Sequence, residues 1–213
     1  MTTLVLIAKE PLPGRAKTRL HPPLSLEQAA ALAAASIDDT LAALATLPAA
    51  RRVLLFEGDA VPARAQGYDV VPQTGGGLDE RLAAAFDDCE GPTLLIGMDT
   101  PQVTVTDLLP AFQAWPHDVD AWFGPATDGG FWALGMREPR GGLIRGVPMS
   151  RDDTGRVQRE RLERAGLRVS ILPTLTDVDT IDSAREVAAL APGTLFARTL
   201  AGFEAAMTAG VGA

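Results

Sequence analysis

Apolar residues along the chain gather in short runs that are separated by longer stretches of mixed character. The runs are rich in branched side chains and end at Pro, Gly or charged residues, a pattern typical of strands buried on both faces. We therefore predict strands at residues 4–8, 53–56, 68–71, 93–97 and 168–172.

The stretches between these runs carry helical periodicity. The clearest begins at Ser25, where Gln28 completes a capping box three positions later, and it ends before Pro48. Its apolar stripe consists of Leu26, Ala30, Ala33, Ile37, Leu41 and Leu44. Further helices are predicted at residues 78–88, 105–114, 154–165 and 180–190.

Strand and helix alternate along most of the chain, which indicates an α/β fold with a mostly parallel central sheet and helices on both faces. The alternation is interrupted in the middle, where residues 120–124 and 131–136 form two β-like runs and residues 141–151 show no periodicity. We expect this region to form the acceptor side of a site. The length of 213 residues fits one domain over residues 1–213.

The composition argues against several classes of function. A formal net charge of −8 opposes broad attraction to nucleic acid or to an anionic membrane, and no apolar run is long enough for a signal-peptide core or a membrane span. The single cysteine, Cys89, has no disulfide partner and lies in an Asp-rich segment that should raise its thiol pKa, so we expect a cytoplasmic protein. Hydrolase, Rossmann oxidoreductase and zinc functions lack their motifs, and His21 and His117 show no ligand spacing.

A basic turn, residues 13–19, directly follows the first predicted strand. Ligands of open parallel sheets bind beyond the carboxyl ends of the strands, which is where this turn lies. Gly14 lets a ligand approach the backbone closely, and the charged donors that a polyphosphate requires are supplied by Arg15, Lys17 and Arg19. A Walker A loop does not fit, because both of its glycine positions hold other residues. The alternative is a solvated basic loop before a helix.

Carboxylates follow two of the predicted strands. Asp99 comes after residues 93–97, at the same rim as the basic turn, and suits Mg²⁺ or Mn²⁺; an Asx-turn is the alternative. Asp177 and Asp179 point to one face of an extended stretch, so either is suited to complete a metal site. Asp179 is equally suited to cap the next helix, with Asp182 at position N3.

Two glycine-rich turns are further candidates. Asp128 precedes Gly129 and Gly130, which indicates either a tight hairpin or the close approach of an acceptor. Gly76 and Gly77 precede a predicted helix, whose first N–H groups are suited to receive a phosphate or to bond to a base. For this second turn, a flexible surface loop is the alternative.

Four motifs occur in order along the chain, at residues 8–20, 97–101, 124–131 and 177–180. As a set they resemble the DUF2064 family of the GT-A, or nucleotide-diphospho-sugar transferase-like, superfamily, which is related to small nucleotidyltransferases and glycosyltransferases. The resemblance extends over residues 4–190. The chain departs from the family pattern at Thr100, where many members have Cys, and within residues 77–81.

The resemblance implies a GT-A (Rossmann-like) three-layer sandwich, with a nucleotide on the first half of the sheet and acceptor groups on the second. It implies that Arg15, Lys17 and Arg19 contact phosphates. It also implies that Asp99 and Asp179 hold a divalent ion, Mg²⁺ or Mn²⁺, which favours the metal-ligand interpretation of Asp179 over the helix-cap interpretation.

These residues favour a transferase with a nucleotide donor and a small-molecule acceptor. The leading hypothesis is nucleotidyl transfer, in which a phosphorylated or anionic acceptor attacks the α-phosphorus of a nucleoside triphosphate while Lys17 and Arg19 stabilise the charge. The alternative is glycosyl transfer from a nucleotide-sugar, with Asp128 orienting an acceptor hydroxyl. It ranks second because Asp99 is followed by Thr100 and Pro101, which leaves the Asp-x-Asp motif incomplete. A nucleotide-binding protein without turnover is the third hypothesis.

Overall fold

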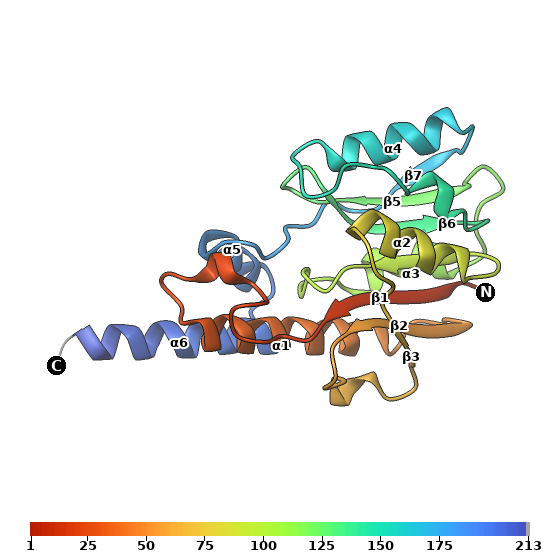
Figure 1. Cartoon of the computed structure of the whole chain (residues 1–213). Coiled ribbons are helices and arrows are strands. Elements are labelled where there is room, and N and C mark those ends of the chain that lie inside the picture. The colour runs from red at the N-terminus through yellow and green to blue at the C-terminus, as the bar shows by residue number, and fades with distance from the viewer. Residues whose placement is uncertain (212–213) are drawn as a thin grey trace.

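A seven-stranded sheet forms the centre of the protein (Figure 1), whose computed structural model describes residues 1–211. The strand order is β3-β2-β1-β4-β6-β5-β7, and β6 runs antiparallel to both of its neighbours while the other pairs are parallel. The mostly parallel sheet that the sequence predicts is therefore confirmed. The strands are β1 Thr3–Lys9, β2 Arg51–Glu57, β3 Asp69–Pro72, β4 Thr93–Ile96, β5 Ala121–Pro125, β6 Phe131–Met136 and β7 Val169–Ile171.

Alternate residues of β1 enter separate apolar cores on the two faces of the sheet. Leu4 and Leu6 pack into one core with side chains of helices α1 and α3, whereas Val5 packs into the other with side chains of α2 and α4. Both faces are thus covered by helices, which explains why the sequence of this central strand is a continuous apolar run. The result is the three-layer α/β sandwich that was expected.

Helix α1 begins where its capping signal predicts. At the start of α1, Ser25 Oγ accepts a hydrogen bond from the Gln28 N–H at 3.2 Å, and the Ser25 N–H donates to Gln28 Oε1 at 2.8 Å. The helices are α1 Leu26–Leu44, α2 Leu78–Asp87, α3 Val105–Phe112, α4 Thr154–Arg164, α5 Ile181–Leu190 and α6 Leu195–Val211, with short 3₁₀ turns η1 Thr18–Leu20, η2 Ala63–Ala65 and η3 Gly141–Leu143. Within residues 1–211, no helix is long and apolar enough to cross a membrane.

Helix α6 is an element that the sequence analysis did not predict. It lies beside α1 and extends away from the sheet (Figure 1), and its Phe196 and Leu200 are buried in a third core with side chains of α1 and α5. Its first N–H groups, those of Leu195 and Phe196, donate to the carboxylate of Asp39 at 2.9 and 2.7 Å. Thr194 also caps the helix locally, since its Oγ1 accepts a hydrogen bond from the Ala197 N–H at 3.1 Å.

The first turn of α4 packs tightly against the turn between β5 and β6. A Cβ on Gly155 would lie 2.4 Å from the Gly130 carbonyl oxygen and 2.9 Å from that of Gly129. We expect Gly155→Ala to lower the free energy of unfolding by about 1–3 kcal/mol, the range for overpacking, as measured by urea denaturation.

The matched control is Gly202→Ala in α6, because a Cβ there meets nothing within 4 Å. This variant should gain up to about 1 kcal/mol, since Ala is the better helix former. Equal responses from the two variants would show that the contact between α4 and the turn is not tight.

Candidate functional site

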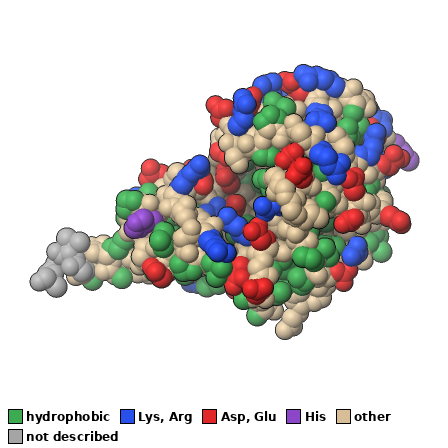
Figure 2. Space-filling view, in the orientation of Figure 1, with side chains coloured by type: hydrophobic (Ala, Val, Ile, Leu, Met, Phe, Trp, Pro, Cys, Tyr) green, Lys and Arg blue, Asp and Glu red, His purple; other side chains and the backbone are tan. Residues whose placement is uncertain are grey.

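A cavity of about 760 Å³ opens at the carboxyl ends of β1 and β4. Its walls come from the turn after β1, the loop after β4, the turn between β5 and β6, the loop before α4 and the loop before α5. Figure 2 shows a hollow in the middle of this face with both basic and acidic side chains around it. The cavity is therefore lined by segments that are far apart in the sequence, as ligand sites of open α/β sheets are.

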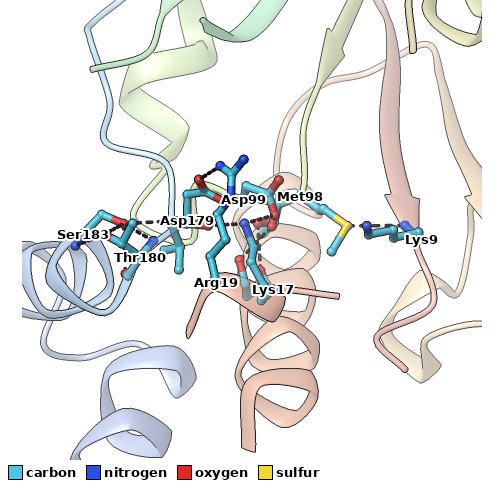
Figure 3. A network of polar contacts seen from close by, with 11 residues as sticks. Lys9, Lys17, Arg19, Met98, Asp99, Asp179, Thr180 and Ser183 are labelled. Carbon is cyan, nitrogen blue, oxygen red and sulfur yellow. Dashed lines mark hydrogen bonds and ion pairs between the residues drawn. The ribbon is translucent and has the colours of Figure 1, made fainter. Parts of the chain in front are cut away.

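Lys17 connects three segments at the centre of this cavity (Figure 3). Its backbone is in the left-handed region, with φ 51° and ψ 37°, and its side chain is only 9% exposed. The Nζ group donates to the Val178 carbonyl oxygen and lies 2.7 Å from Asp99 Oδ1. The predicted phosphate-binding lysine and the predicted first metal ligand are thus ion-paired to each other.

Arg19 and Asp179 form a second ion pair on the more exposed side of the cavity. Thr180, not Asp179, is the N-cap of α5: its Oγ1 accepts a hydrogen bond from the Ser183 N–H at 3.2 Å. The helix-cap interpretation of Asp179, with Asp182 at N3, is therefore wrong, because Ser183 occupies N3. The Asp179 carboxylate meets Arg19 instead of the helix.

The other residues of the basic turn divide into two groups. Arg15 lines the cavity, and its backbone N–H is held by the Leu12 carbonyl oxygen at 3.0 Å. Gly14 is not among the cavity-lining residues; it has φ +74°, a left-handed conformation that favours glycine. Gly14 therefore shapes the turn, and Arg15 supplies an exposed cation to the cavity.

The second half of the cavity is lined by carboxylates. Asp128 Oδ1 accepts a hydrogen bond from the Gly130 N–H at 2.8 Å, so it forms the tight turn of the hairpin while also lining the cavity. Asp177 lines the same region, where burial and then the negative charges of Asp128 and Asp99 raise the pKa of its carboxyl group. No Lys or Arg of residues 1–211 forms an ion pair with Asp128 or Asp177. This half of the cavity therefore holds two carboxylates that have no ion-pair partner among the described residues.

The predicted metal ligands, Asp99 and Asp179, line one cavity, but each is paired with a cation of the basic turn. Among the residues described, no group of three or more His, Cys, Asp or Glu side chains is spaced to hold an ion. Asp99 Oδ1 is buried, and its one partner in that part of the chain is Lys17 Nζ. Two carboxylates fit Mg²⁺ or Mn²⁺ together with substrate phosphates, so the residues present fit a metal that arrives with a nucleotide.

Gly76 and Gly77 lie at the start of α2, outside the set of cavity-lining residues. The Gly77 N–H donates to Glu80 Oε2 at 3.0 Å, so the Glu80 side chain already occupies the donor that was expected to contact a phosphate or a base. The proposed ligand contacts of these glycines therefore receive no support from their positions.

The sequence analysis missed three residues that line the cavity near β2, β3 and the start of α2. These are Glu57, Gln73 and Arg81. Glu57 ends β2 and Gln73 follows β3, so both stand at the carboxyl ends of strands, as the basic turn does. Their position after parallel strands was the signal from which Glu57 and Gln73 could have been predicted as site residues. The loop before α4 adds Arg151 and Asp152, from a region without periodicity.

The sheet order and the cavity at the carboxyl ends of its strands define the class: a GT-A, nucleotide-diphospho-sugar transferase-like fold. A candidate nucleotide-diphospho-sugar transferase from Desulfovibrio desulfuricans G20 superimposes with a TM-score of 0.81 at 29% sequence identity, over 94% of this chain and 92% of that one. The chain belongs to the DUF2064 family, described as uncharacterised proteins conserved in bacteria, whose profile matches residues 30–151.

More distant structures share the fold. The 2-C-methyl-D-erythritol 4-phosphate cytidylyltransferase of Thermus thermophilus has a TM-score of 0.55 at 17% identity, over 90% of this chain and 100% of that one. A cytidylyltransferase from Leptospira borgpetersenii serovar Hardjo-bovis (strain JB197) has a TM-score of 0.58 at 10% identity, over 97% and 95% of the two chains. No curated protein sequence matches this chain.

Proposed function

We propose that the protein is a metal-dependent transferase that takes a nucleotide as its donor. The observation that carries this proposal is the meeting of two cation–carboxylate pairs, Lys17 with Asp99 and Arg19 with Asp179, in one cavity beside the end of β1. The names of the solved structures of this fold, which include a nucleotide-diphospho-sugar transferase and cytidylyltransferases, support the same class of donor.

Within this class, the leading proposal is nucleotidyl transfer. An acceptor oxygen attacks the α-phosphorus of a nucleoside triphosphate, the bond from that phosphorus to the bridging oxygen breaks, and pyrophosphate leaves with the electron pair. Lys17 and Arg19 stabilise the charge that collects on the phosphate oxygens, so no protein nucleophile is required. Mg²⁺ or Mn²⁺, held by Asp99 and Asp179, would add further charge neutralisation.

Glycosyl transfer from a nucleotide-sugar is the second candidate, and two observations favour it. Asp128 and Asp177 place two carboxylates without an ion-pair partner in the acceptor half of the described cavity, which suits an acceptor hydroxyl better than the phosphorylated acceptor expected from the sequence. The Desulfovibrio desulfuricans structure, which is 29% identical to this chain, is also named for nucleotide-diphospho-sugars. In this reaction the acceptor oxygen displaces the nucleoside diphosphate from the anomeric carbon.

The products distinguish the candidates. The protein is incubated with each nucleoside triphosphate and each common nucleotide-sugar, with Mg²⁺ or Mn²⁺ and a mixture of sugar phosphates and polyols. Nucleotidyl transfer predicts release of pyrophosphate, whereas glycosyl transfer predicts release of free nucleoside diphosphate. If nucleotides bind but none is consumed, the chain is a nucleotide-binding protein and both transfer proposals fail.

A further inference from the structure

We propose that Arg81 reads the base of the bound nucleotide and selects bases that carry a carbonyl oxygen. The inference rests on the proposed function, because it requires that the phosphates lie on the basic turn. It concerns the part of the cavity toward β2, β3 and α2, whose lining includes Glu57, Gln73, Leu78, Arg81 and Leu82.

This end of the cavity differs in chemistry from the acceptor half. It combines the apolar side chains of Leu78 and Leu82 with the guanidinium group of Arg81, whose ion pair with Glu57 neutralises that carboxylate, whereas the carboxylates of Asp128 and Asp177 in the acceptor half have no ion-pair partner among the described residues. A planar base requires apolar surface for its faces and a few fixed polar groups for its edge. The β2–β3 end supplies both.

The Arg81 side chain is held in place by hydrogen bonds on two of its three nitrogens. Nε donates to the Gly76 carbonyl oxygen at 3.1 Å, and Nη1 donates to Glu57 Oε2 at 2.7 Å and to Gln73 Oε1 at 3.2 Å. Nη2 has no hydrogen-bond partner among the described residues, although Arg81 lines the cavity. A rigid guanidinium fork therefore keeps one nitrogen, with two N–H donors, for a ligand.

Gln73 does not read the base itself, because its amide is already engaged. Its Nε2 donates to the Ala8 carbonyl oxygen at 2.8 Å and to that of Leu55 at 3.3 Å, and its Oε1 accepts from Arg81. Gln73 is therefore a positioning residue that ties Arg81 to the ends of β1 and β2. Of the hydrogen bonds that hold Gln73 and Arg81, none uses the two N–H donors of Arg81 Nη2; the exposed Lys9, which also lines the cavity, carries further donors.

Free N–H donors select an acceptor edge. Cytosine, uracil and guanine each present a carbonyl oxygen, and guanidinium donors pair well with such oxygens. Adenine has no carbonyl group and presents an amino donor at position 6. An adenine amino group facing Arg81 would leave two donors opposed, so adenine nucleotides should bind more weakly.

The test compares nucleotides with different bases and includes one pair, ATP and ITP, whose bases differ only at position 6. Calorimetric titrations with Mg²⁺ use ATP, GTP, CTP, UTP, ITP and inorganic tripolyphosphate, which has no base; ITP differs from ATP in its 6-oxo group. We expect an oxo-base nucleotide to bind tightest. In Arg81→Met its affinity should fall by roughly 5- to 150-fold, the equivalent of one good base contact, while tripolyphosphate affinity stays unchanged.

Two further variants complete the design. Arg81→Lys keeps the charge but loses the planar fork, and it should also lose the preference for oxo bases. Arg198→Met in α6 is the matched control, since Arg198 bonds to the Gly193 carbonyl oxygen away from the cavity. Unchanged tripolyphosphate binding shows that each variant is folded.

Several outcomes would overturn the inference while leaving the proposed function intact. These are tightest binding of ATP, an unchanged base preference in Arg81→Met, or a loss of tripolyphosphate affinity in that variant equal to its loss of nucleotide affinity. Failure of the wild-type protein to bind any nucleotide, by contrast, would contradict the proposed function itself.

Discussion

Lys17→Ala is expected to weaken nucleotide binding by roughly 1.5–3 kcal/mol, or about 10- to 150-fold, the range for a hydrogen bond to a charged group. The Lys17 side chain is nearly buried and its Nζ lies beside Asp99 at the floor of the cavity. A phosphate that reaches this position gains a desolvated cation, which no neighbouring residue replaces. Isothermal titration with nucleoside triphosphates and Mg²⁺ measures the change.

Lys9→Ala is the comparison, because Lys9 is the other lysine of the chain and also lines the cavity. Lys9 is exposed and forms no ion pair with a carboxylate of residues 1–211, so its loss should cost less than the loss of Lys17. Circular dichroism establishes that both variants are folded. Equal affinity of Lys17→Ala and wild type would remove Lys17 from the phosphate site.

Asp99→Asn is expected to lower turnover on the order of 10²- to 10³-fold, the usual effect of losing one preorganised electrostatic group. The substitution preserves the shape of the side chain but removes the charge that Asp99 offers to a divalent ion. The nucleotide affinity of this variant should therefore no longer rise when Mg²⁺ is added. Turnover and affinity are measured over a series of Mg²⁺ concentrations.

Asp182→Asn serves as the matched control, because its carboxylate is on α5, is 90% exposed and does not line the cavity. It should keep wild-type turnover and metal dependence. Full metal dependence in Asp99→Asn would show that Asp99 is not a metal ligand.

The elements that the sequence predicted correctly are those whose signals are local. The capping box of Ser25 and Gln28 and the apolar run of β1 are readable within a few residues, and both have the predicted structure. Helix α6 was missed although Thr194 caps it locally, and its second cap, Asp39, lies 156 residues before Leu195 in the chain. The start of α5 was predicted one residue early, at Thr180, since Asp179 and Thr180 are both good capping residues and only the structure separates them.

For the site, a topological rule was more informative than spacing. The rule that ligands bind beyond the carboxyl ends of parallel strands brought the basic turn and Asp99 to one rim, and the structure pairs Lys17 with Asp99 there. It could not reveal that Gln73 Nε2 donates to two backbone carbonyls while its Oε1 accepts from Arg81, because these contacts join β1, β2 and α2. Such contacts exist only in the folded chain.

The central claim is that nucleotide phosphates and a divalent ion share one cavity. Phosphates that bind alone must compete with Asp99 and Asp179 for Lys17 and Arg19, whereas an added ion satisfies the carboxylates and releases both cations to the phosphates. The most direct measurement is a calorimetric titration of the wild-type protein with each nucleoside triphosphate, with and without Mn²⁺.

We predict that at least one nucleotide binds at a single site, more tightly with Mn²⁺ than without, and that it raises the affinity for Mn²⁺ by the same factor. Absence of nucleotide binding, or an affinity that is identical with and without the ion, would contradict the account.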